Sequence, residues 1–410
     1  MEFGVPGHPF IWLAGALLGA VWLSRLVAVG FNMHKIAELT APEFDVATVN
    51  GAPLPRVSIV VPARNEAEHI EAALQSLLLL DYPDYEVIAV DDRSDDGTGK
   101  ILDRMQEEWR ERGEHLHHRL KVLHITQLPS GWLGKAHAMW TAGKQAQGEW
   151  ILFTDGDVVF RVDALRRAVG YAERERADHM VLFPTMVMKS AGERMMIAFF
   201  QSQFVFARRP WKVADPEAHD AIGVGAFNLI RNSVYRQIGT YEAMRLEVLD
   251  DMRLGELVKQ HGCRQRVAFG RDLLRLRWIA GAMGMVDNLS KNGFAILRFS
   301  PWFAALAVFG VLLVNVGPLA GTCLATGWAK SGFVAALATQ VMIYVGMSWH
   351  SDVSPIYVLL HPIGAVLFCY AVVRSAVVTL RNGGVVWRDT LYPLAELRQF
   401  NREKPRRTWL

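Results

Sequence analysis

The sequence predicts an α/β domain, in which helices cover both faces of a parallel β-sheet, together with transmembrane helices. Two observations lead to this prediction. In residues 56–153, short apolar segments typical of buried strands alternate with helix-length segments of mixed polarity. Long apolar segments lie near both ends of the chain, whereas the composition of the middle is that of a soluble protein.

Composition narrows the class of protein. The 410 residues suffice for two or three domains, or for one domain with membrane segments. The hydrophobic fraction, 51%, is slightly above the soluble average, and the net charge of +3 is too small to indicate a nucleic-acid partner. The three cysteines, Cys263, Cys323 and Cys369, are far apart and lack the spacing of metal ligands.

The first predicted element is a transmembrane helix in residues 1–32, whose apolar stretch is long enough to cross a bilayer. No Lys or Arg precedes this stretch, whereas Arg25 and Lys35 lie at or after its end. By the positive-inside rule, the N-terminus is then outside and the following chain is in the cytoplasm. A buried core helix is the alternative.

A polar linker, residues 33–55, leads to the α/β segment. The pattern predicts strands at 57–61, 86–90, 120–123 and 151–153, and helices at 66–80, 98–112 and 135–147. Ligands bind such sheets at the carboxyl ends of the strands. Those ends carry three polar clusters, at 62–66, 91–94 and 155–157. The sequence therefore predicts a binding site at one edge of the sheet.

Asp155 and Asp157 follow the last of these strands and are separated by Gly156. In an extended chain, side chains at i and i+2 point the same way, so both carboxylates can converge on one object. Two hard oxygen ligands suit Mg²⁺ or Mn²⁺, with water and substrate phosphates filling the other positions. An ordinary acidic β-turn is the alternative.

Five segments together resemble a known family: VSIVVPARNEAEHI, VIAVDDRSDDGT, GWLGKAHAMWTAG, ILFTDGDVVF and LDDMRLGELVKQHG. In this order and spacing they resemble an inverting family 2 glycosyltransferase with the GT-A fold, a Rossmann-like mixed sheet with helices on both faces. The resemblance covers residues 56–275. It is strongest to membrane-attached bacterial enzymes that glycosylate lipids, such as the carotenoid-acid and hopanoid-associated glycosyltransferases. It implies a hexosyltransferase that moves a sugar from a UDP-sugar to a lipid acceptor.

The resemblance also implies roles for individual residues. It assigns metal binding to Asp157, and Asp155 would face either the metal or the ribose. It assigns the hydrogen bond to uracil to Asp91 and, more weakly, to Asp92. A solvated acidic turn is the alternative for this pair. The loop residues Pro62, Arg64, Asn65 and Glu66 surround the nucleoside. Asn65 can also be read as a helix N-cap with Glu68 near the N3 position.

Lys135 follows a glycine-containing turn, so its ammonium group can meet a diphosphate as a point charge. An inverting transfer needs a base for the acceptor hydroxyl. The family resemblance gives that role to Asp251, with Asp250 as its neighbour in place of the usual Glu. Helix-start charge that complements the macrodipole is the alternative for this pair.

Related processive enzymes carry a Q/R-x-x-R-W motif after the base. Here the first position is Leu274, which argues against a polymer-extending synthase. Arg275 and Arg277 remain possible diphosphate contacts. The GVGAF stretch, residues 223–227, is expected to shape the acceptor side rather than to bind a dinucleotide.

The remaining segments concern the membrane. Residues 195–211 and an interfacial segment at 276–300 are predicted to bring the active site to the bilayer, with a core helix as the alternative for the first. C-terminal transmembrane segments are predicted within 301–380, namely 301–326, 332–349 and 356–380, followed by a basic tail at 381–410.

Three full crossings would put this tail outside, whereas its arginines favour the cytoplasm. We therefore expect one segment to be re-entrant or interfacial. The predicted location is the cell membrane, with several crossings and a cytoplasmic catalytic domain. A polyprenyl-phosphate glycosyltransferase and a non-catalytic membrane scaffold remain as alternative functions.

Overall fold

The computed structural model describes residues 9–113, 119–388 and 390–403, so the ends of the predicted segments 1–32 and 381–410 lie outside the described residues. The chain divides into two compact units. We call the first, Ile36–Val187 and Pro210–Arg277, the sheet unit. The second, the helical unit, contains the described parts of Met1–Lys35, Met188–Arg209 and Trp278–Asn401. The predicted range 56–275 also included residues 188–209, and the functional boundaries stay a prediction.

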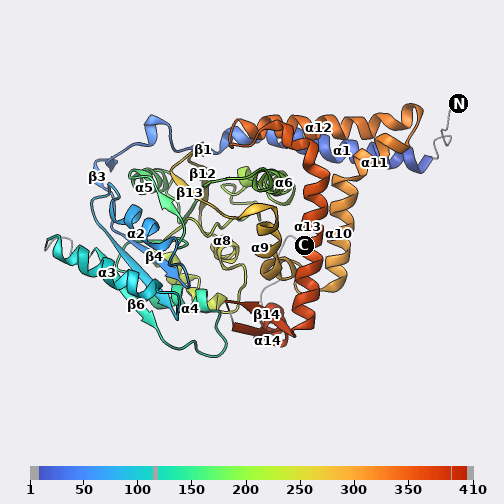
Figure 1. The fold of residues 1–410 in the computed structure, drawn as a ribbon. Helices are drawn as coiled ribbons and strands as arrows, with labels where there is room; N and C mark the ends of the chain where they lie inside the picture. Colours follow the sequence, from blue (N-terminus) through green and yellow to red (C-terminus); the bar gives the residue numbers. More distant parts are fainter. Residues whose placement is uncertain (1–8, 114–118, 389, 404–410) are drawn as a thin grey trace. The chain divides into compact units, whose positions relative to one another are not determined.

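An eight-stranded sheet forms the core of the sheet unit (Figure 1). Its strands, in spatial order, are β1 (Ala37–Glu38), β12 (Gln265–Phe269), β9 (His179–Phe183), β11 (Asn228–Arg231), β7 (Trp150–Phe153), β4 (Val57–Ala63), β5 (Tyr85–Asp92) and β6 (Leu120–Ile125). Strand β11 is antiparallel to both of its neighbours, and the other pairs are parallel. The predicted mixed α/β sheet is confirmed.

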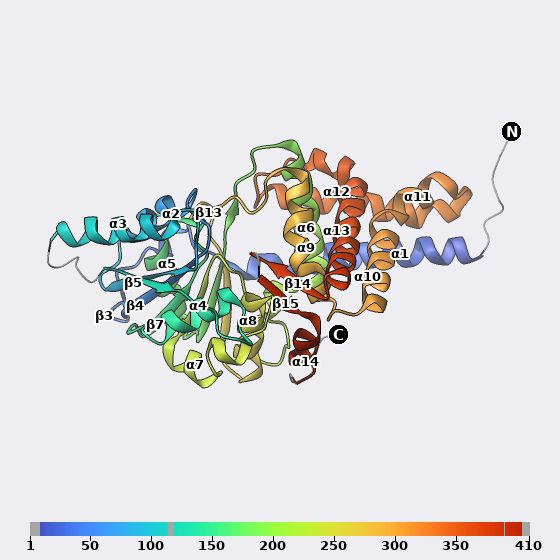
Figure 2. The same ribbon diagram turned by 60° about the horizontal axis from the view of Figure 1, so that its bottom comes forward.

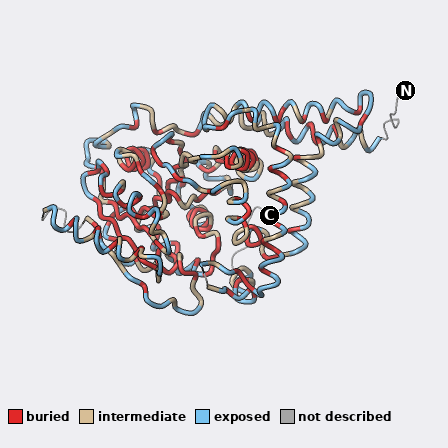
Figure 3. Tube along the Cα trace, in the orientation of Figure 1, coloured by how far each residue is buried: buried red, intermediate tan, exposed pale blue. Residues whose placement is uncertain are grey.

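The central strands are apolar because helices cover both faces of the sheet. Helices α2 (Ile70–Leu78), α3 (Thr98–Glu111) and α5 (Ala164–Arg174) lie on one face, and α4 (Gly134–Gly143), α7 (Asn232–Gln237) and α8 (Asp250–Gln260) lie on the other (Figure 2). Buried residues concentrate in these layers (Figure 3). Helix α5 buries Leu165, Ala168, Val169 and Ala172, the spacing of one helical face.

Several predicted boundaries differ from the structure, among them the end of the helix predicted at 135–147, which is Gly143, and two of the differences have a clear physical reason. Strand β4 continues through Pro62, which is tolerated because β7 pairs with β4 only as far as Val60. The helix predicted at 66–80 begins at Ile70 instead. The residues expected to form its first turn make contacts with the loop after β5 instead. The Asn65 N–H donates to the Ser94 hydroxyl oxygen, and the Glu66 N–H donates to the Thr98 hydroxyl oxygen. The N-cap is His69, so the interpretation of Asn65 as the cap is wrong.

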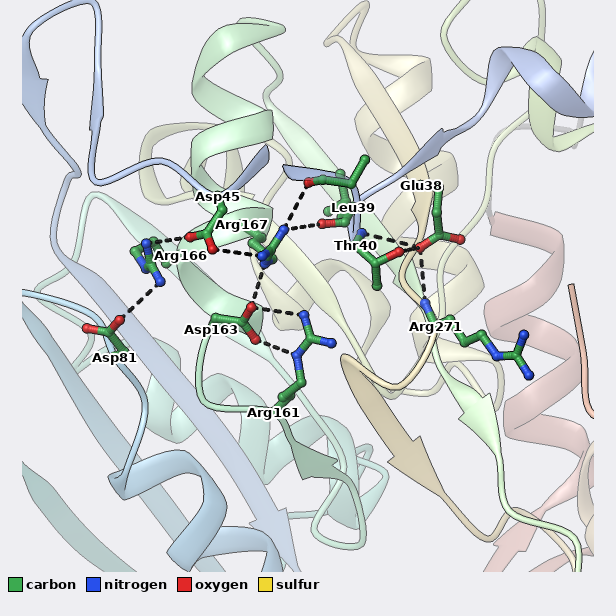
Figure 4. A network of polar contacts seen from close by, with 11 residues as sticks. Glu38, Leu39, Thr40, Asp45, Asp81, Arg161, Asp163, Arg166, Arg167 and Arg271 are labelled. Carbon is green, nitrogen blue, oxygen red and sulfur yellow. Dashed lines mark hydrogen bonds and ion pairs between the residues drawn. The ribbon is translucent and has the colours of Figure 1, made fainter. Parts of the chain in front are cut away.

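A network of ion pairs fixes the linker to helix α5 (Figure 4). Asp163 accepts hydrogen bonds from Arg161 at 2.6 and 2.9 Å and from Arg167 at 2.5 Å. Arg167 also bonds Asp45 at 2.8 Å and the carbonyl oxygen of Leu39 at 2.9 Å. The chain that leaves the first predicted membrane helix is thus held against the sheet unit by charged, partly buried groups.

We expect Asp163→Asn to lower the stability by about 2 kcal/mol at pH 7. Burial raises the pKa of Asp163, but the hydrogen bonds from Arg161 and Arg167 outweigh it and bring the pKa to about 2, below the usual 3.8. A lowered carboxyl pKa stabilises the fold above the unfolded value, so this contribution is full above pH 4. It is lost as the pH falls toward 2. Thermal unfolding of the detergent-purified protein should show a lower Tm for the variant at pH 7.

The matched control is Asp81→Asn, in the same network. The Asp81 side chain is 65% exposed and pairs with Arg166 at 3.1 Å. Exposed pairs contribute at most about 1 kcal/mol, so its Tm should stay near that of the wild type. Equal melting of Asp163→Asn and the wild type at pH 7 would contradict the prediction.

The helical unit consists of antiparallel and parallel helix pairs. Its elements are α1 (Pro9–Asn32), α6 (Ala191–Ala207), α9 (Gly281–Ile296), α10 (Pro301–Asn315), α11 (Gly317–Leu324), α12 (Ser331–Ser348), α13 (His361–Arg381), the hairpin β14 (Gly384–Trp387) and β15 (Thr390–Pro393), and the start of α14 (Leu394–Glu403). Helix α1 packs beside α12, and α10 beside α13 (Figure 1).

Three stretches among the described residues are long and apolar enough to cross a membrane: Pro9–Lys35, Gly327–Ser348 and Pro355–Arg381. Helices α10 and α11 pass the same test as a pair that is bent by 51°. Helix α6, in contrast, buries Met196, Ile197 and Phe199 within the helical unit. The alternative of a core helix therefore fits residues 195–207 better than an interfacial one.

Candidate active site

The turn that carries Asp155 and Asp157 follows β7, next to the loop after β4. Gly156 is enclosed there, since a Cβ atom on it would lie 3.2 Å from both the Pro62 carbonyl oxygen and the Ile70 Cδ1 atom. The Glu66 side chain lies at the same place, 3.9 Å from that Cβ position. The predicted convergence of the loops after β4 and β7 is therefore present.

Lys135 joins this turn to helix α8. Its Nζ atom lies 2.7 Å from Asp155 Oδ1 and 3.7 Å from Asp250 Oδ2. Burial lowers the pKa of Lys135, but Asp155 and Asp250 outweigh it and the net shift is upward. The ammonium group is therefore charged at neutral pH. It offsets part of the negative charge of Asp155, Asp250 and Asp251.

Asp250 and Asp251 occupy the first turn of α8, where the helix dipole favours negative charge. Asp251 Oδ2 accepts the Gly225 N–H at 3.1 Å, and Oδ1 accepts the Met252 N–H at 2.7 Å. Burial, followed by the charge of Asp250, raises the pKa of Asp251 to about 6. Burial also raises the pKa of Asp250, against the opposing effect of Lys135. Asp251 is thus ionised near neutral pH yet basic enough to accept a proton.

The GVGAF stretch forms the wall between the two acidic groups. A Cβ atom on Gly225 would lie 2.4 Å from Asp155 Oδ2, and one on Gly223 would lie 1.7 Å from the Asp251 carbonyl oxygen. Both positions therefore require glycine for close approach rather than for an unusual φ angle. This stretch holds the carboxylates in place, which its expected role at the acceptor side did not include.

We expect Gly225→Ala to reduce turnover by about 10- to 100-fold while the protein remains folded, because misplacing a reacting group by about 1 Å has an effect of that size. The added methyl group must displace the Asp155 carboxylate. Steady-state rates with a saturating donor and the Tm would be measured together. Gly346→Ala is the control, since no atom lies within 4 Å of its Cβ position. Wild-type turnover of Gly225→Ala would contradict this role of the glycine.

Asp157, the second carboxylate of the turn, is half-buried. Burial, followed by the charges of Asp155 and Glu66, raises its pKa to about 6. Asp155 and Asp157 supply carboxylate oxygens, the ligands that a hard divalent cation prefers, and Mg²⁺ is usually bound through one or two carboxylates. The residues therefore fit a Mg²⁺ or Mn²⁺ ion that also takes oxygens from a substrate. Within the described ranges, no group of three or more His, Cys, Asp or Glu side chains makes a complete metal cage.

The predicted nucleoside residues lie at the end of β5. Asp91 and Asp92 are both buried. Asp92 is paired with the neighbouring Arg93, at 2.8 and 3.1 Å. Asp91 Oδ1 accepts the Ser94 N–H, and Oδ2 lies 3.1 Å from a ring nitrogen of His124. These are built contacts rather than the freely solvated acidic turn that was the alternative.

The loop at 62–66 adjoins the loop after β5. Asn65 has a positive φ of 53°, and its Oδ1 accepts the Asp95 N–H at 3.0 Å. The Arg64 Nε atom is buried without a hydrogen-bond partner among the described residues. The two loops thus form one surface, and the proposed contacts of Pro62, Arg64, Asn65 and Glu66 with a nucleoside stay predictions.

The predicted arginines behave differently. Arg275 is exposed and its Nε atom lies 3.5 Å from Asp272 Oδ1, and its contact with a diphosphate stays a prediction. It is the register partner of Val159 in the small sheet of β10 (Thr185–Met186), β13 (Leu274–Leu276) and β8 (Val159–Phe160). Arg277 is exposed just after β13. Its contact with a diphosphate stays a prediction.

Sequence reasoning gave no role to Tyr241 or His124, and it included Gly225 and Arg93 only as members of the stretches 223–227 and 91–94. The Tyr241 hydroxyl lies 3.5 Å from Asp250 Oδ2, although Tyr241 belongs to no motif. His124 follows the predicted strand 120–123, whose neighbour the sequence did not identify. Had the sequence shown that strand 120–123 pairs with strand 86–90, the register would have placed His124 opposite Asp91.

Residues 58–239 match the family model described as glycosyl transferase family 2. This segment belongs to glycosyltransferase family 2. It ends before α8, so the model does not extend to Asp250 and Asp251.

The chain is similar in sequence to two glycosyltransferases of known name. The chain is 34% identical over 162 residues to a beta-monoglucosyldiacylglycerol synthase of Synechocystis sp., covering 39% of this chain and 31% of the relative. It is 23% identical over 243 residues to a 4,4'-diaponeurosporenoate glycosyltransferase of Staphylococcus haemolyticus, covering 58% and 60%. The chain thus spans less than two thirds of the length of either relative.

Among solved structures, the mannosyltransferase PcManGT from Pyrobaculum calidifontis was determined in complex with GDP-Man and Mn²⁺. It is 19% identical, covers 90% of this chain and 99% of its own, and has a TM-score of 0.49. TarS of S. aureus, residues 1–349 with UDP-GlcNAc, is 16% identical, covers 80% of this chain and 92% of its own, and has a TM-score of 0.39.

Proposed function

We propose that the protein is a membrane-bound glycosyltransferase that moves a sugar from a UDP-sugar to a lipid acceptor and inverts the anomeric centre. One observation carries the proposal. The first turn of α8 and the turn after β7 meet through Lys135 and Gly225, which brings a carboxyl with a pKa of about 6 beside a half-buried acidic turn. A base for the acceptor and a site for the donor diphosphate are thereby neighbours.

Asp251 is the base in this mechanism. Its carboxylate takes the proton of the acceptor hydroxyl, the acceptor oxygen forms a bond to the anomeric carbon, and the bond from that carbon to the UDP oxygen breaks. The Gly225 N–H fixes one Asp251 oxygen, so the carboxylate is oriented before the acceptor arrives. Attack on the face opposite the leaving group gives inversion.

The diphosphate leaving group is met by cationic groups. A divalent cation held by Asp157 and Asp155 would stabilise the charge that develops on the leaving oxygen. Lys135 adds a fixed positive charge and holds Asp155 in place. Asp91 accepts hydrogen bonds from the nucleoside, for which carboxylate oxygens suit the imide N–H of uracil.

Two features support a lipid acceptor. Two of the relatives are named as a beta-monoglucosyldiacylglycerol synthase and a 4,4'-diaponeurosporenoate glycosyltransferase. This chain also has three stretches, among its described residues, that are apolar and long enough to cross a bilayer. A hydrophobic acceptor dissolved in the membrane would reach an enzyme that is held there, whereas the nucleotide sugar comes from water.

The helix directions within the helical unit support a cytoplasmic tail. Helices α1 and α12 run the same way, since Gly15 lies against Gly332 and, further along both helices, Leu26 and Met347 pack on one cluster. Helix α11 runs back beside them, from Leu18 toward the start of α12. The chain from α11 to α12 is then a hairpin that returns to the side where α1 ends.

Helix α13 follows this hairpin and carries Arg374, which pairs with Asp287 at 2.7 Å. A charged pair is costly at the centre of a bilayer, so we place α13 along the interface. The basic tail then stays in the cytoplasm, and the conflict between three crossings and the positive-inside rule disappears.

An impermeant maleimide tests this arrangement in cells. The native cysteines are first replaced by serine, and Thr390→Cys is compared with Asp84→Cys in the sheet unit. Both should react only after the membrane is opened. Reaction of Thr390→Cys in intact cells, with Asp84→Cys protected, would show that α13 crosses the membrane.

The catalytic proposal is tested with purified protein, a panel of UDP-sugars and a membrane lipid extract. We expect one UDP-sugar to be consumed with Mn²⁺ or Mg²⁺, a glycolipid to appear in equal amount, and the new bond to have the inverted configuration. Absence of UDP binding and of glycolipid with every donor would refute the proposal and favour a scaffold that retains only the fold.

A further inference from the structure

The strand register places a histidine beside the carboxylate that is proposed to receive the nucleoside. Asp91 of β5 and His124 of β6 are register partners in the parallel sheet, so their side chains lie on the same face. Helix α3 covers that face and brings Asp103 to the other side of the ring. No motif contains His124, and the proposed mechanism does not use it.

Both ring nitrogens of His124 face carboxylates. The Nδ1 atom lies 3.1 Å from Asp91 Oδ2, and the Nε2 atom lies 2.9 Å from Asp103 Oδ1. A neutral imidazole has one N–H, so one of the two contacts would then set a lone pair against a carboxylate. Only the protonated ring donates to both.

Asp91 is held at both of its oxygens. The Ser94 N–H binds Oδ1 at 3.1 Å while His124 binds Oδ2. Gly99, in the first turn of α3, leaves the space that this arrangement needs, because a Cβ atom there would lie 2.7 Å from Asp91 Oδ2. Each oxygen keeps a second lone pair, so Asp91 can still accept a hydrogen bond from a ligand.

We propose that His124 positions Asp91 for the nucleoside of the donor, and that protonation of His124 links donor affinity to pH. This inference rests on the proposed function. His124 is a positioning residue, since it acts through Asp91 and not on the reacting atoms.

The surroundings of His124 determine the sign of the effect. Burial lowers the pKa of His124, but the hydrogen bonds to Asp103 and Asp91 outweigh it and the net shift is upward from 6.5. Asp91 on β5 and Asp103 on α3 are the charged groups that face the ring, and β6 is the edge strand of the sheet. Donor affinity supported by His124 should therefore be full at pH 6 and fall as the pH rises through that raised pKa.

Three variants separate the possible roles of His124. In His124→Asn, the amide nitrogen can take the place of Nδ1 and donate to Asp91 without titrating. In His124→Ala, no donor remains. In Asp103→Asn, the Asp91 contact is kept, but the second carboxylate that favours the protonated ring is lost.

UDP binding to the full-length protein in detergent would be measured by calorimetry with Mn²⁺ from pH 6 to 8.5. We expect His124→Ala to weaken UDP binding roughly tenfold at pH 6.5, the size of a hydrogen bond to a charged group. His124→Asn should bind as the wild type does at pH 6.5 but lack its loss of affinity at higher pH. Asp103→Asn should shift that loss to lower pH. In transfer assays, His124→Ala should raise KM for the donor and leave kcat unchanged.

Ionisation of the metal-binding carboxylates should raise UDP affinity as the pH rises, which is opposite to the effect expected from His124. The difference between the wild type and His124→Asn therefore isolates the contribution of the histidine. If His124→Ala keeps the wild-type affinity and pH profile, the positioning role is refuted and the proposed function stands. If His124→Ala and His124→Asn lose affinity equally and both have lower Tm values, His124 is structural and the proposal also fails. If the wild type binds no UDP at any pH, the proposed function itself is wrong.

Discussion

Asp251→Asn is expected to reduce kcat about 10³-fold, within the range of 10²- to 10⁴-fold that a general base contributes. Asparagine has nearly the same shape and can still accept the Gly225 N–H, but it takes up no proton. UDP affinity should be unchanged, because no predicted donor contact involves Asp251. Initial rates with a saturating UDP-sugar and lipid acceptor, together with calorimetry of UDP, measure the two effects separately.

Glu242→Gln is the matched control, an exposed carboxylate shortly before α8. Its kcat should equal that of the wild type. Transfer by Asp251→Asn at the wild-type rate would remove Asp251 from the mechanism. If this variant loses transfer to a hydroxyl acceptor but transfers normally to a polyprenyl phosphate, the alternative function is favoured, because a phosphate acceptor is already anionic and needs no strong base.

The same residue predicts a pH profile. Burial and the neighbouring Asp250 raise the pKa of Asp251 to about 6. A base acts in its ionised form, so kcat/KM should be constant above that pKa and fall about tenfold for each pH unit well below it. Rates from pH 4.5 to 8 in a mixed buffer would check this. A constant rate down to pH 4.5 would show that no group of raised pKa acts as the base.

Asp157→Ala is expected to abolish the metal dependence of UDP binding and to weaken UDP binding in Mn²⁺ about a hundredfold, which corresponds to about 2.7 kcal/mol. The reason is that burial and the charges of Asp155 and Glu66 raise the pKa of Asp157, so a divalent cation would relieve an unfavourable negative charge there. Calorimetry of UDP in Mn²⁺ and in EDTA measures the effect. In EDTA, the wild type and the variant should bind alike.

Asp84→Asn provides the comparison for this measurement, because Asp84 precedes β5 and its side chain is 63% exposed. Its UDP affinity should respond to Mn²⁺ as that of the wild type does. Metal-dependent binding that survives in Asp157→Ala would place the ion on other residues. The Tm of Asp157→Ala should not fall, since removal of a half-buried carboxylate with a raised pKa relieves an unfavourable charge.

The sequence was sufficient for the order of the elements and for three of the site loops. Alternating apolar and amphipathic segments predict β4, α3 and β7 nearly as the structure has them. A period of two or of 3.6 residues is a local property, so it can be read without knowing which segments meet. The carboxyl ends of parallel strands lie at one edge of a sheet. For this reason Asp91, Asp155 and Asp157 could be predicted as site residues from the sequence, whereas the residues that contact them could not.

Local reasoning failed where a loop used its backbone for contacts distant in sequence. The expected start of α2 was four residues too early because the N–H groups of Asn65 and Glu66 bond the loop after β5. Residues 195–207 looked interfacial from their aromatic content, yet the structure buries much of this helix inside the helical unit.

The chain by itself determined the family, the acidic turn and the apolar segments, because these depend on residue type and spacing. Only the tertiary structure decided which groups stand together. Lys135 pairs with Asp155 and Asp250, the Gly225 N–H binds Asp251, and His124 faces Asp91. These contacts join segments that are far apart in the sequence, and neighbouring charges shift the pKa values of Lys135, Asp251 and His124. Such shifts follow distance and burial, which strand register and loop packing determine and which no periodicity in the sequence records.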